Sequence, residues 1–257
     1  RIADSTRYKN WKPKEQFFGT FYYGRYIREL KLGYTVDYFH EEIMNRGLPR
    51  APYYETAFDD YYTTSRFNNS VSLNGQLNKK YYLNTLFAYN RYGRIKNTYF
   101  KDLTTLGELL TAGQGDQDTT RFSNFTARGS ISTSRDSSKL NYEIGYDVNR
   151  ETAYGLRIEE QVQHIADYAL FSSVEYKPVS KLTIRPGLRL TYNSDYKAPL
   201  VPSVHFRYAL NKTHTLRFSY ARGFRAPSVK ELYFYFVDIN HNITGNPALQ
   251  AEQEELA

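Results

Sequence analysis

The stretch LNYEIGYDVN at residues 140–149 decides the fold, because apolar and polar side chains alternate through it without a break. The even positions hold Leu140, Tyr142, Ile144, Tyr146 and Val148, and the odd positions hold Asn141, Glu143, Gly145, Asp147 and Asn149. A repeat of two residues is the period of a β-strand, in which successive side chains point to opposite faces of the sheet. The stretch is therefore predicted to be a strand with one apolar face and one polar face.

Other segments along the chain repeat this alternation. They are residues 16–26, 31–40, 67–77, 81–92, 121–133, 164–176, 182–193, 201–210 and 215–224. The connections between them alternate between tight turns, such as 78–80 and 177–180, and mostly long irregular stretches, such as 41–66 and 100–120. The sequence thus predicts an all-β chain of about ten or eleven antiparallel strands joined as hairpins.

The length of the segments and the placement of the long connections favour a membrane-spanning barrel over a soluble sandwich. The segments run for about 10–14 residues, whereas strands of globular proteins usually have about 5–6. Short turns fall at one end of the strands and long loops at the other, as in outer-membrane barrels. Mean hydropathy is −0.67 and no run approaches 18 apolar residues, which excludes a transmembrane helix, but a barrel strand needs only about 9–11 residues. Tyrosine, present 26 times, suits a membrane–water interface.

In a membrane barrel the two faces of each strand meet different surroundings. A charge on the lipid face near the bilayer midplane costs about 2–4 kcal/mol, so the apolar face must meet lipid. The residues expected to face lipid are Leu140, Tyr142, Ile144, Leu188, Leu190, Phe206 and Tyr208. Those expected to face the lumen are Asn141, Glu143, Asp147, Arg185, Arg189, Arg207 and Arg217. So many charges cannot form a dry core, and we expect the lumen to hold water or another polar domain.

Several classes of function find no support in the composition. The chain has no cysteine, which removes disulfides, thiol catalysis and cysteine metal sites. The net charge of +7 comes from scattered Lys and Arg, with no basic tract of the kind that binds nucleic acid. No phosphate-binding loop, HExxH or GxSxG motif is present. We therefore expect neither an enzyme nor a resident metal or cofactor.

Two segments near the end of the chain resemble the paired boxes of TonB-dependent outer-membrane receptors. The first box is RFSYARGFRAPSVKELYF at residues 217–234, centred on Phe224, Arg225, Ala226 and Pro227. The second box is GNPALQAE at residues 245–252, with Asn246, Pro247 and Leu249. The resemblance implies a strand that ends at the outer rim, a loop that contains the second box, and a new strand from about Gln253. It also implies a plugged barrel of about 22 strands.

The resemblance further implies that the protein imports a scarce chelate across the outer membrane of a Gram-negative cell. An iron–siderophore complex, haem and cobalamin all stay open as the ligand. The implied partners are membrane lipids, the protein's own plug domain, the TonB complex and the transported small chelate, with no nucleic acid. Residues 1–257 contain no plug domain, TonB box or closing strand, so we expect an incomplete part of a single barrel domain. A passive porin-like or structural outer-membrane barrel is the alternative.

Two groups of residues are candidates for contacts inside or above the barrel. The luminal arginines Arg185, Arg189, Arg207 and Arg217 are expected to contact the plug or to pair with acids such as Glu143 and Asp147, because interior charges usually pair. An anionic ligand is the other interpretation. Tyr53, Tyr54, Tyr61 and Tyr62 are expected in the loop at 41–66, where they either surround a ligand or belong to an aromatic girdle.

His241 is the residue that bears most directly on the ligand. It lies between the two boxes, in the expected extracellular loop, where haem receptors of the resembled family carry an axial-ligand histidine. Imidazole binds haem iron in this way, so haem as a transported ligand is one hypothesis, and an ordinary exposed histidine is the other. His40 and His164, also expected near the outer ends of strands, are further candidates, whereas we assign no role to His205 or His214.

Overall fold

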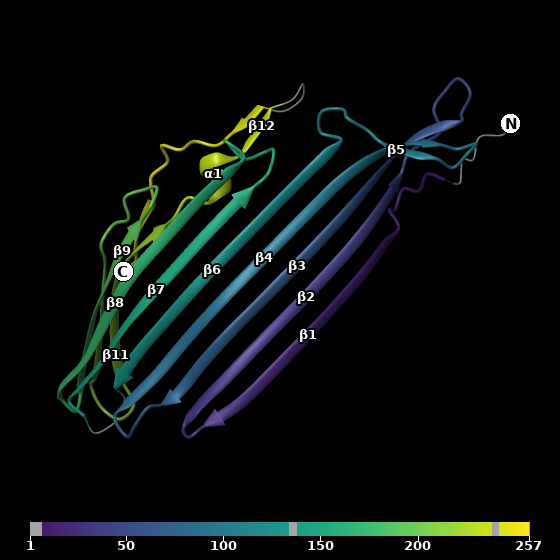
Figure 1. Cartoon of the computed structure of the whole chain (residues 1–257). Helices are drawn as coiled ribbons and strands as arrows, with labels where there is room; N and C mark the ends of the chain where they lie inside the picture. The colour runs from purple at the N-terminus through teal and green to yellow at the C-terminus, as the bar shows by residue number, and fades with distance from the viewer. Residues whose placement is uncertain (1–6, 134–137, 238–241, 257) are drawn as a thin grey trace.

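The computed structural model describes residues 7–133, 138–237 and 242–256, and almost all of them lie in long antiparallel strands (Figure 1). The elements are β1 (Lys14–Ile27), β2 (Leu30–Arg46), β3 (Thr56–Gln76), β4 (Tyr81–Asp102), β5 (Glu108–Leu110), β6 (Gln117–Thr133), β7 (Leu140–Tyr154), β8 (Val162–Val179), β9 (Leu182–Asn193), β10 (Val201–Ala209), β11 (Thr215–Arg225), α1 (Val229–Tyr233), β12 (Tyr235–Val237), β13 (Asn242–Thr244) and β14 (Glu252–Leu256). The prediction of an all-β antiparallel chain is confirmed.

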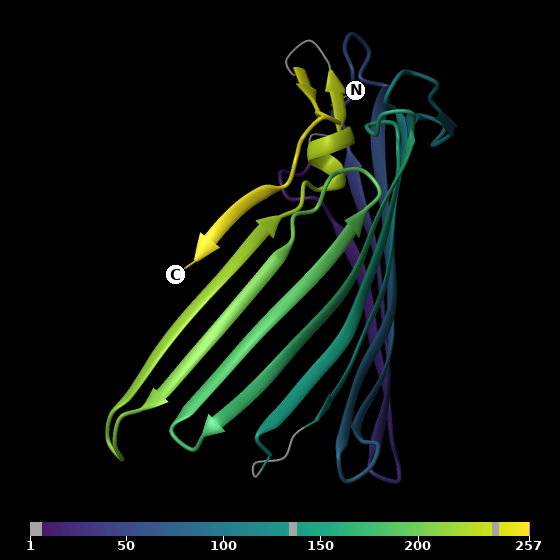
Figure 2. The ribbon, with the colours of Figure 1, turned by 90° about the vertical axis from the view of Figure 1, so that its left-hand side faces the viewer.

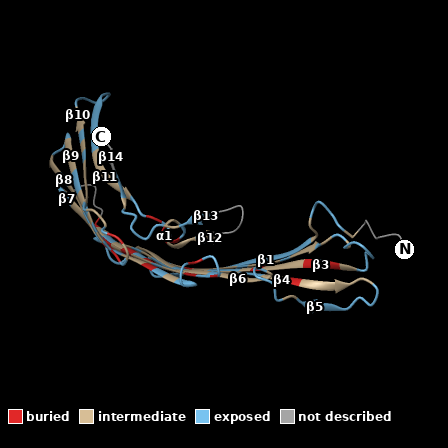
Figure 3. Cartoon of the chain, turned by 90° about the horizontal axis from the view of Figure 1, so that it is seen from above, coloured by how far each residue is buried: buried red, intermediate tan, exposed pale blue. Residues whose placement is uncertain are grey.

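One sheet of 12 strands contains every strand except β12 and β13. Its order is β1-β2-β3-β4-β6-β7-β8-β9-β10-β11-β14, with β5 paired to β4, so neighbours in the sheet are mostly neighbours in the chain. Within the described residues the sheet curves without closing, and β1 and β14 are its two ends (Figure 3). The short turns gather at the lower end of the strands and the long connections at the upper end (Figures 1 and 2).

The sheet has a concave face, on which α1 and the β12–β13 hairpin stand, and a convex face (Figure 3). Directly paired residues of antiparallel strands share a face, so the register carries each face from strand to strand. Asp147 is paired with Arg128 of β6 and Ala169 of β8, and all three lie on the concave face. The neighbouring residues of β7, such as Ile144 and Val148, lie on the convex face.

The convex face carries large apolar side chains that contact little protein. Ile144 is 59% exposed and Leu190 is 53% exposed, so these side chains require an apolar environment outside the chain. Tyrosines lie along both borders of this apolar band. Near the short turns, the Tyr142 hydroxyl donates a hydrogen bond to the Tyr81 hydroxyl at 3.2 Å. Near the upper border, the rings of Tyr168 and Tyr192 lie against each other with centroids 6.4 Å apart. Such an arrangement is typical of a strand wall that spans a bilayer.

Two of the predicted long connections are shorter than the sequence indicates, and they run over 47–55 and 103–116. β2 continues to Arg46 and β3 begins at Thr56, and likewise β4 continues to Asp102 and β6 begins at Gln117. The prediction of irregular chain was wrong for 41–46 and 56–66 and for 100–102 and 117–120, because both faces of these strand ends carry polar side chains mixed with aromatic ones. Without one buried face, a strand shows no alternation of apolar and polar residues.

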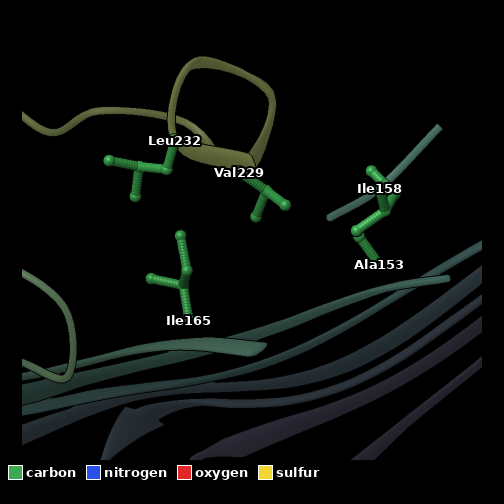
Figure 4. Close-up of a cluster of buried hydrophobic side chains, with 5 residues drawn as sticks. All are labelled: Ala153, Ile158, Ile165, Val229 and Leu232. Atoms are coloured by element: carbon green, nitrogen blue, oxygen red, sulfur yellow. The ribbon is translucent and has the colours of Figure 1, made fainter. Parts of the chain in front are cut away.

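The apolar core is small and lies at the upper rim. Val229 and Leu232 of α1 pack on Ala153 of β7, Ile158 of the β7–β8 connection and Ile165 of β8, and all five are nearly inaccessible to solvent (Figure 4). This cluster holds α1 against the concave face. None of the helices formed by the described residues is long and apolar enough to span a membrane.

Candidate functional site

The concave face carries an ion-pair network centred on Asp147. Its Oδ2 atom accepts hydrogen bonds from Nη2 of Arg128 at 2.7 Å and from Nη2 of Arg189 at 3.1 Å. Arg128 is directly opposite Asp147, whereas Arg189 reaches it across β8, where the small Ala169 leaves room. Asp147 is only 8% exposed, so its charge depends on these two partners. The network joins β6, β7 and β9 and leaves one positive charge in excess.

A second network begins one strand further along, at Asp167 of β8. Its Oδ1 atom accepts from Nδ2 of Asn193 at 2.7 Å and from the hydroxyl of Tyr196 at 3.1 Å. Asn193 Oδ1 in turn accepts the backbone N–H groups of Asp195 and Tyr196 at 2.7 and 3.2 Å. Burial, and then the carboxylate of Asp167, raise the pKa of Tyr196, so its hydroxyl stays a donor at neutral pH.

The connection at residues 194–200 is also attached to α1. The Tyr233 hydroxyl donates to Asp195 Oδ1 at 2.6 Å, and this hydrogen bond to a carboxylate raises the pKa of Tyr233 to about 12. The two networks border a cavity of about 550 Å³ on the concave face, whose lining includes Arg128, Asp147, Asp167, Arg189, Tyr196 and Ala226. Charged and hydroxyl groups thus surround a space open to a polar solute or to a polar domain.

The first box ends β11 and begins α1. The Ser228 hydroxyl accepts the Glu231 N–H at 3.3 Å, and the Glu231 carboxylate accepts the Ser228 N–H at 2.8 Å, which is a capping box. Arg225 forms an ion pair with Glu231 and also lies 3.7 Å, Nη1 to Oε2, from Glu252 of β14. The Ser228 N–H and then the Arg225 guanidinium lower the pKa of Glu231 to about 2.

The second box closes onto the same short helix. The Asn246 N–H donates to the Glu231 carbonyl at 2.9 Å, and a Cβ atom at Gly245 would lie 2.5 Å from the Leu232 carbonyl oxygen. Only glycine allows this approach of the two backbones. The other members of the second box, Pro247 and Leu249, are exposed at the rim. The two boxes therefore form one structural unit around α1, and Arg225 connects that unit to β14, which begins at Glu252.

The structure places the four predicted arginines on the concave face, in two different situations. Arg189 belongs to the Asp147 network, and Arg185 lies 3.5 Å from Glu143 Oε2. Arg207 and Arg217 are directly opposite each other on β10 and β11, and neither forms an ion pair with any residue in the described ranges. Opposed like charges destabilise an antiparallel pair.

The four candidate tyrosines do not gather in one loop. Tyr53 and Tyr54 lie in the connection at 47–55 and are 79% and 50% exposed. Tyr61 and Tyr62 belong to β3, contrary to the prediction, and as neighbours in a strand they point to opposite faces. Tyr61 contacts Tyr99 edge to face, with ring centroids 5.6 Å apart, and the guanidinium of Arg94 lies over the ring of Tyr62. A shared ligand contact of all four is incompatible with this arrangement.

The histidines are dispersed. His241 lies outside the described residues. His40 Nε2 lies 3.3 Å from Glu42 Oε1, and His164 Nδ1 lies 2.9 Å from the Thr152 hydroxyl. Over the part of the chain that the structure describes, no group of three or more His, Cys, Asp or Glu residues is arranged to hold a metal ion.

Sequence reasoning did not single out three parts of this site. Arg128 and Tyr196 become visible only once the strand register is known, because their partners are 19 and 29 residues away. The helix α1 did have a local signal, the spacing of Ser228 and Glu231 in a capping box.

Comparison with known proteins agrees with this fold. Residues 10–253 match the family described as TonB dependent receptor-like, beta-barrel. No curated protein sequence gives a significant match. The siderophore receptor PirA of Pseudomonas aeruginosa is similar in structure, with a TM-score of 0.50 and 15% identity, over 99% of this chain and 49% of that chain.

Two other solved structures are similar at lower scores. They are the ferric enterobactin receptor PfeA in complex with BCV-L6 (TM-score 0.49, 12% identity, 93% of this chain and 50% of that chain) and the copper transporter OprC (TM-score 0.46, 12% identity, 90% and 47%). At 15% identity the likeness to PirA concerns the fold alone. The chain spans about half the length of the structures that it matches.

Proposed function

The chain belongs to the β-barrel family of TonB-dependent receptors, and on this premise we propose that it forms part of the wall of an outer-membrane receptor that imports a scarce chelate. The family match over residues 10–253 is the observation that carries the proposal. The convex apolar band would face lipid, and residues 1–257 would contribute to a single barrel domain. The polar concave face would line the lumen.

The charges of the concave face suggest what fills that lumen. Arg128 and Arg189 share the carboxylate of Asp147, and Arg185 has Glu143, so each of these three arginines has an acidic partner. Arg207 and Arg217, which face each other near the short-turn end, lack such a partner within the described residues. We infer that an acidic group of a plug domain lies between these two arginines, because an interior charge usually has a partner.

Energised import is tested in cells. The full-length protein would be expressed in iron-starved Gram-negative cells that lack their own receptors, with and without TonB. Accumulation of labelled ferric catecholate, ferric hydroxamate, haem and cobalamin would then be measured. One of these chelates should accumulate only when TonB is present. Equal accumulation without TonB would replace the proposal by a passive barrel.

Haem as the ligand is a separate proposal and depends on His241. The full-length protein would be titrated with haem, and the Soret band of the His241→Ala variant compared with that of the natural protein. The control is His214→Ala, in a turn at the opposite end of the strands. Loss of Soret-band binding in His241→Ala alone supports an axial ligand, whereas unchanged binding removes His241 from that role.

A further inference from the structure

The convex face contains a hollow of about 420 Å³ above the apolar band, formed by β2, β3, β4 and β6. Gly93 is part of its lining and lies directly opposite Ser65 on one side and Arg121 on the other. A Cβ atom at Gly93 would find Ser65 Oγ at 3.5 Å as its nearest neighbour, so the space above the glycine is open. The hollow is therefore a depression left by a missing side chain.

Two arginines stand at one side of this hollow. Arg121 of β6 is opposite Gly93, and Arg91 of β4 is opposite Ser123, two residues further along β6, so the arginines are diagonal neighbours on one face. Both are exposed, and within the described residues neither forms an ion pair. Arg121 lies over the ring of Tyr154, 5.7 Å from its centroid, and Tyr154 is on β7, on the side of Arg121 away from Gly93, so the Arg121 guanidinium stands at the edge of the hollow.

The remaining lining is suited to a phosphate group with an apolar continuation. Thr63, Ser65 and Thr119 bring hydroxyl groups to the hollow, and Tyr38 and Phe67 form its apolar part. The nearest acid on this face by register is Glu42, opposite Thr63, and it lies beside His40. The hollow thus has a net positive charge, hydroxyl donors and an adjoining aromatic surface.

The height of the two arginines matches the headgroup layer of a bilayer. From Tyr81 at the short-turn end to Arg91, a rise of about 3.3 Å per residue and a tilt of about 40° give a height of about 25 Å. That is about the height of the apolar band of a membrane barrel. The guanidinium groups therefore lie just outside the hydrocarbon, where a charge is not penalised and lipid phosphates are found.

We propose that this hollow binds the phosphate group of an anionic lipid in the outer leaflet. Arg91 and Arg121 hold the phosphate oxygens, Ser65 and Thr63 donate further hydrogen bonds, and the first acyl carbons contact Phe67. The lipid, and not dissolved phosphate, is the occupant because the hollow opens directly onto the apolar band. The inference rests on the proposed location in an outer membrane.

The test uses the full-length protein in dodecyl maltoside micelles. Binding of bisphosphorylated lipid A is compared with binding of dephosphorylated lipid A and of inorganic phosphate by native mass spectrometry. We expect the phosphorylated lipid to bind and the other two to bind at least tenfold more weakly, as for a two-arginine site. Equal binding of the two lipids would overturn the proposal, and so would binding of inorganic phosphate as strong as that of the lipid.

Variants then assign the binding to the hollow. The double variant Arg91→Gln/Arg121→Gln should lose about thirtyfold in affinity, since an arginine at an anionic surface contributes about fivefold. The matched control is Arg150→Gln, an exposed convex-face arginine of β7 outside the hollow, which should stay within about twofold of the natural protein. Gly93→Val keeps both arginines and fills the space, and it should also abolish binding.

The outcomes separate this inference from the proposed function. Equal losses in Arg150→Gln and in the double variant would indicate attraction by overall charge and overturn the assignment to the hollow. Retained affinity in Gly93→Val would do the same. If cell fractionation places the protein outside the outer membrane, the proposed function fails. If the Arg91→Gln/Arg121→Gln variant is in the outer membrane and binds the lipid as well as the natural protein does, only the lipid site is refuted.

Discussion

Replacing Asp147 by asparagine tests whether the ion-pair network holds the wall together. Each charge-assisted hydrogen bond to Asp147 contributes about 1.5–3 kcal/mol, and the amide oxygen of asparagine keeps part of that interaction. The side chain of Arg128 is 63% exposed and that of Arg189 is 34% exposed, so water compensates the first arginine more than the second. The free energy of unfolding should therefore fall by about 2 kcal/mol, mostly through Arg189.

The measurement is urea unfolding of the full-length protein in phospholipid vesicles, with Glu143→Gln as the control. Glu143 lies 3.5 Å from the half-exposed Arg185, and removing its charge should cost about 0.5 kcal/mol. In a protein that already carries Arg189→Gln, Asp147→Asn should lower the free energy of unfolding by about 1 kcal/mol less than it does in the natural protein. If Asp147→Asn costs no more than Glu143→Gln, the network contributes nothing specific to stability and the reasoning is refuted.

Three further predictions concern the upper rim. Gly245→Ala should lower the free energy of unfolding by about 2 kcal/mol, because its methyl group would meet backbone atoms, whereas Gly223→Ala, with no atom within 4 Å, should change it by less than about 0.5 kcal/mol. In the folded protein the pKa of Glu231 is lowered from 4.5 to about 2, so the charged carboxylate stabilises the N-terminal cap of α1. This stabilisation should be lost as the pH falls from about 4.5 through about 2. Hydrogen-exchange protection of α1, corrected for the intrinsic rate, measures this loss, and Glu231→Gln should abolish its pH dependence. Tyr196→Phe should cost about 1–2 kcal/mol in urea unfolding through the lost hydrogen bond to a carboxylate. Tyr192→Phe, on the exposed convex face, should be neutral, and equal effects of the two changes would contradict the network.

The alternation of residues predicted the strands where one face is apolar, and it failed where both faces are polar. The segment at 140–149 lies within β7, and the alternating residues at 182–193 coincide with β9. The upper parts of β2 and β3 were predicted to be irregular, in a stretch that contains Pro49, Pro52, Asp59 and Asp60. In the structure Asp59 is buried by an ion pair with Arg7, a partner 52 residues away that no local pattern indicates.

The site was predictable in type but not in arrangement. Alternation together with the need to keep charge out of lipid was enough to group Arg185, Arg189 and Asp147 on one face. Which arginine meets which acid depends on strand register, and register is a relation between distant segments that the sequence alone does not specify. The paired boxes were recognised as two motifs, and only the structure shows that Arg225 and the backbone at Asn246 join them around α1.

The uneven length of the strands makes the sheet taller on one flank than on the other. β3 and β4 have 21 and 22 residues, whereas β9 and β10 have 12 and 9, and all rise from the same short-turn end (Figure 2). A difference of about ten residues corresponds to a step of about 25 Å in height. On the flank with the shorter strands, α1 and the β12–β13 hairpin stand above the strand ends, so these elements and not the sheet form the upper rim there (Figures 1 and 2). The shorter strands thus leave room above them for α1, which the connection at 194–200 holds through the hydrogen bond from Tyr233 to Asp195.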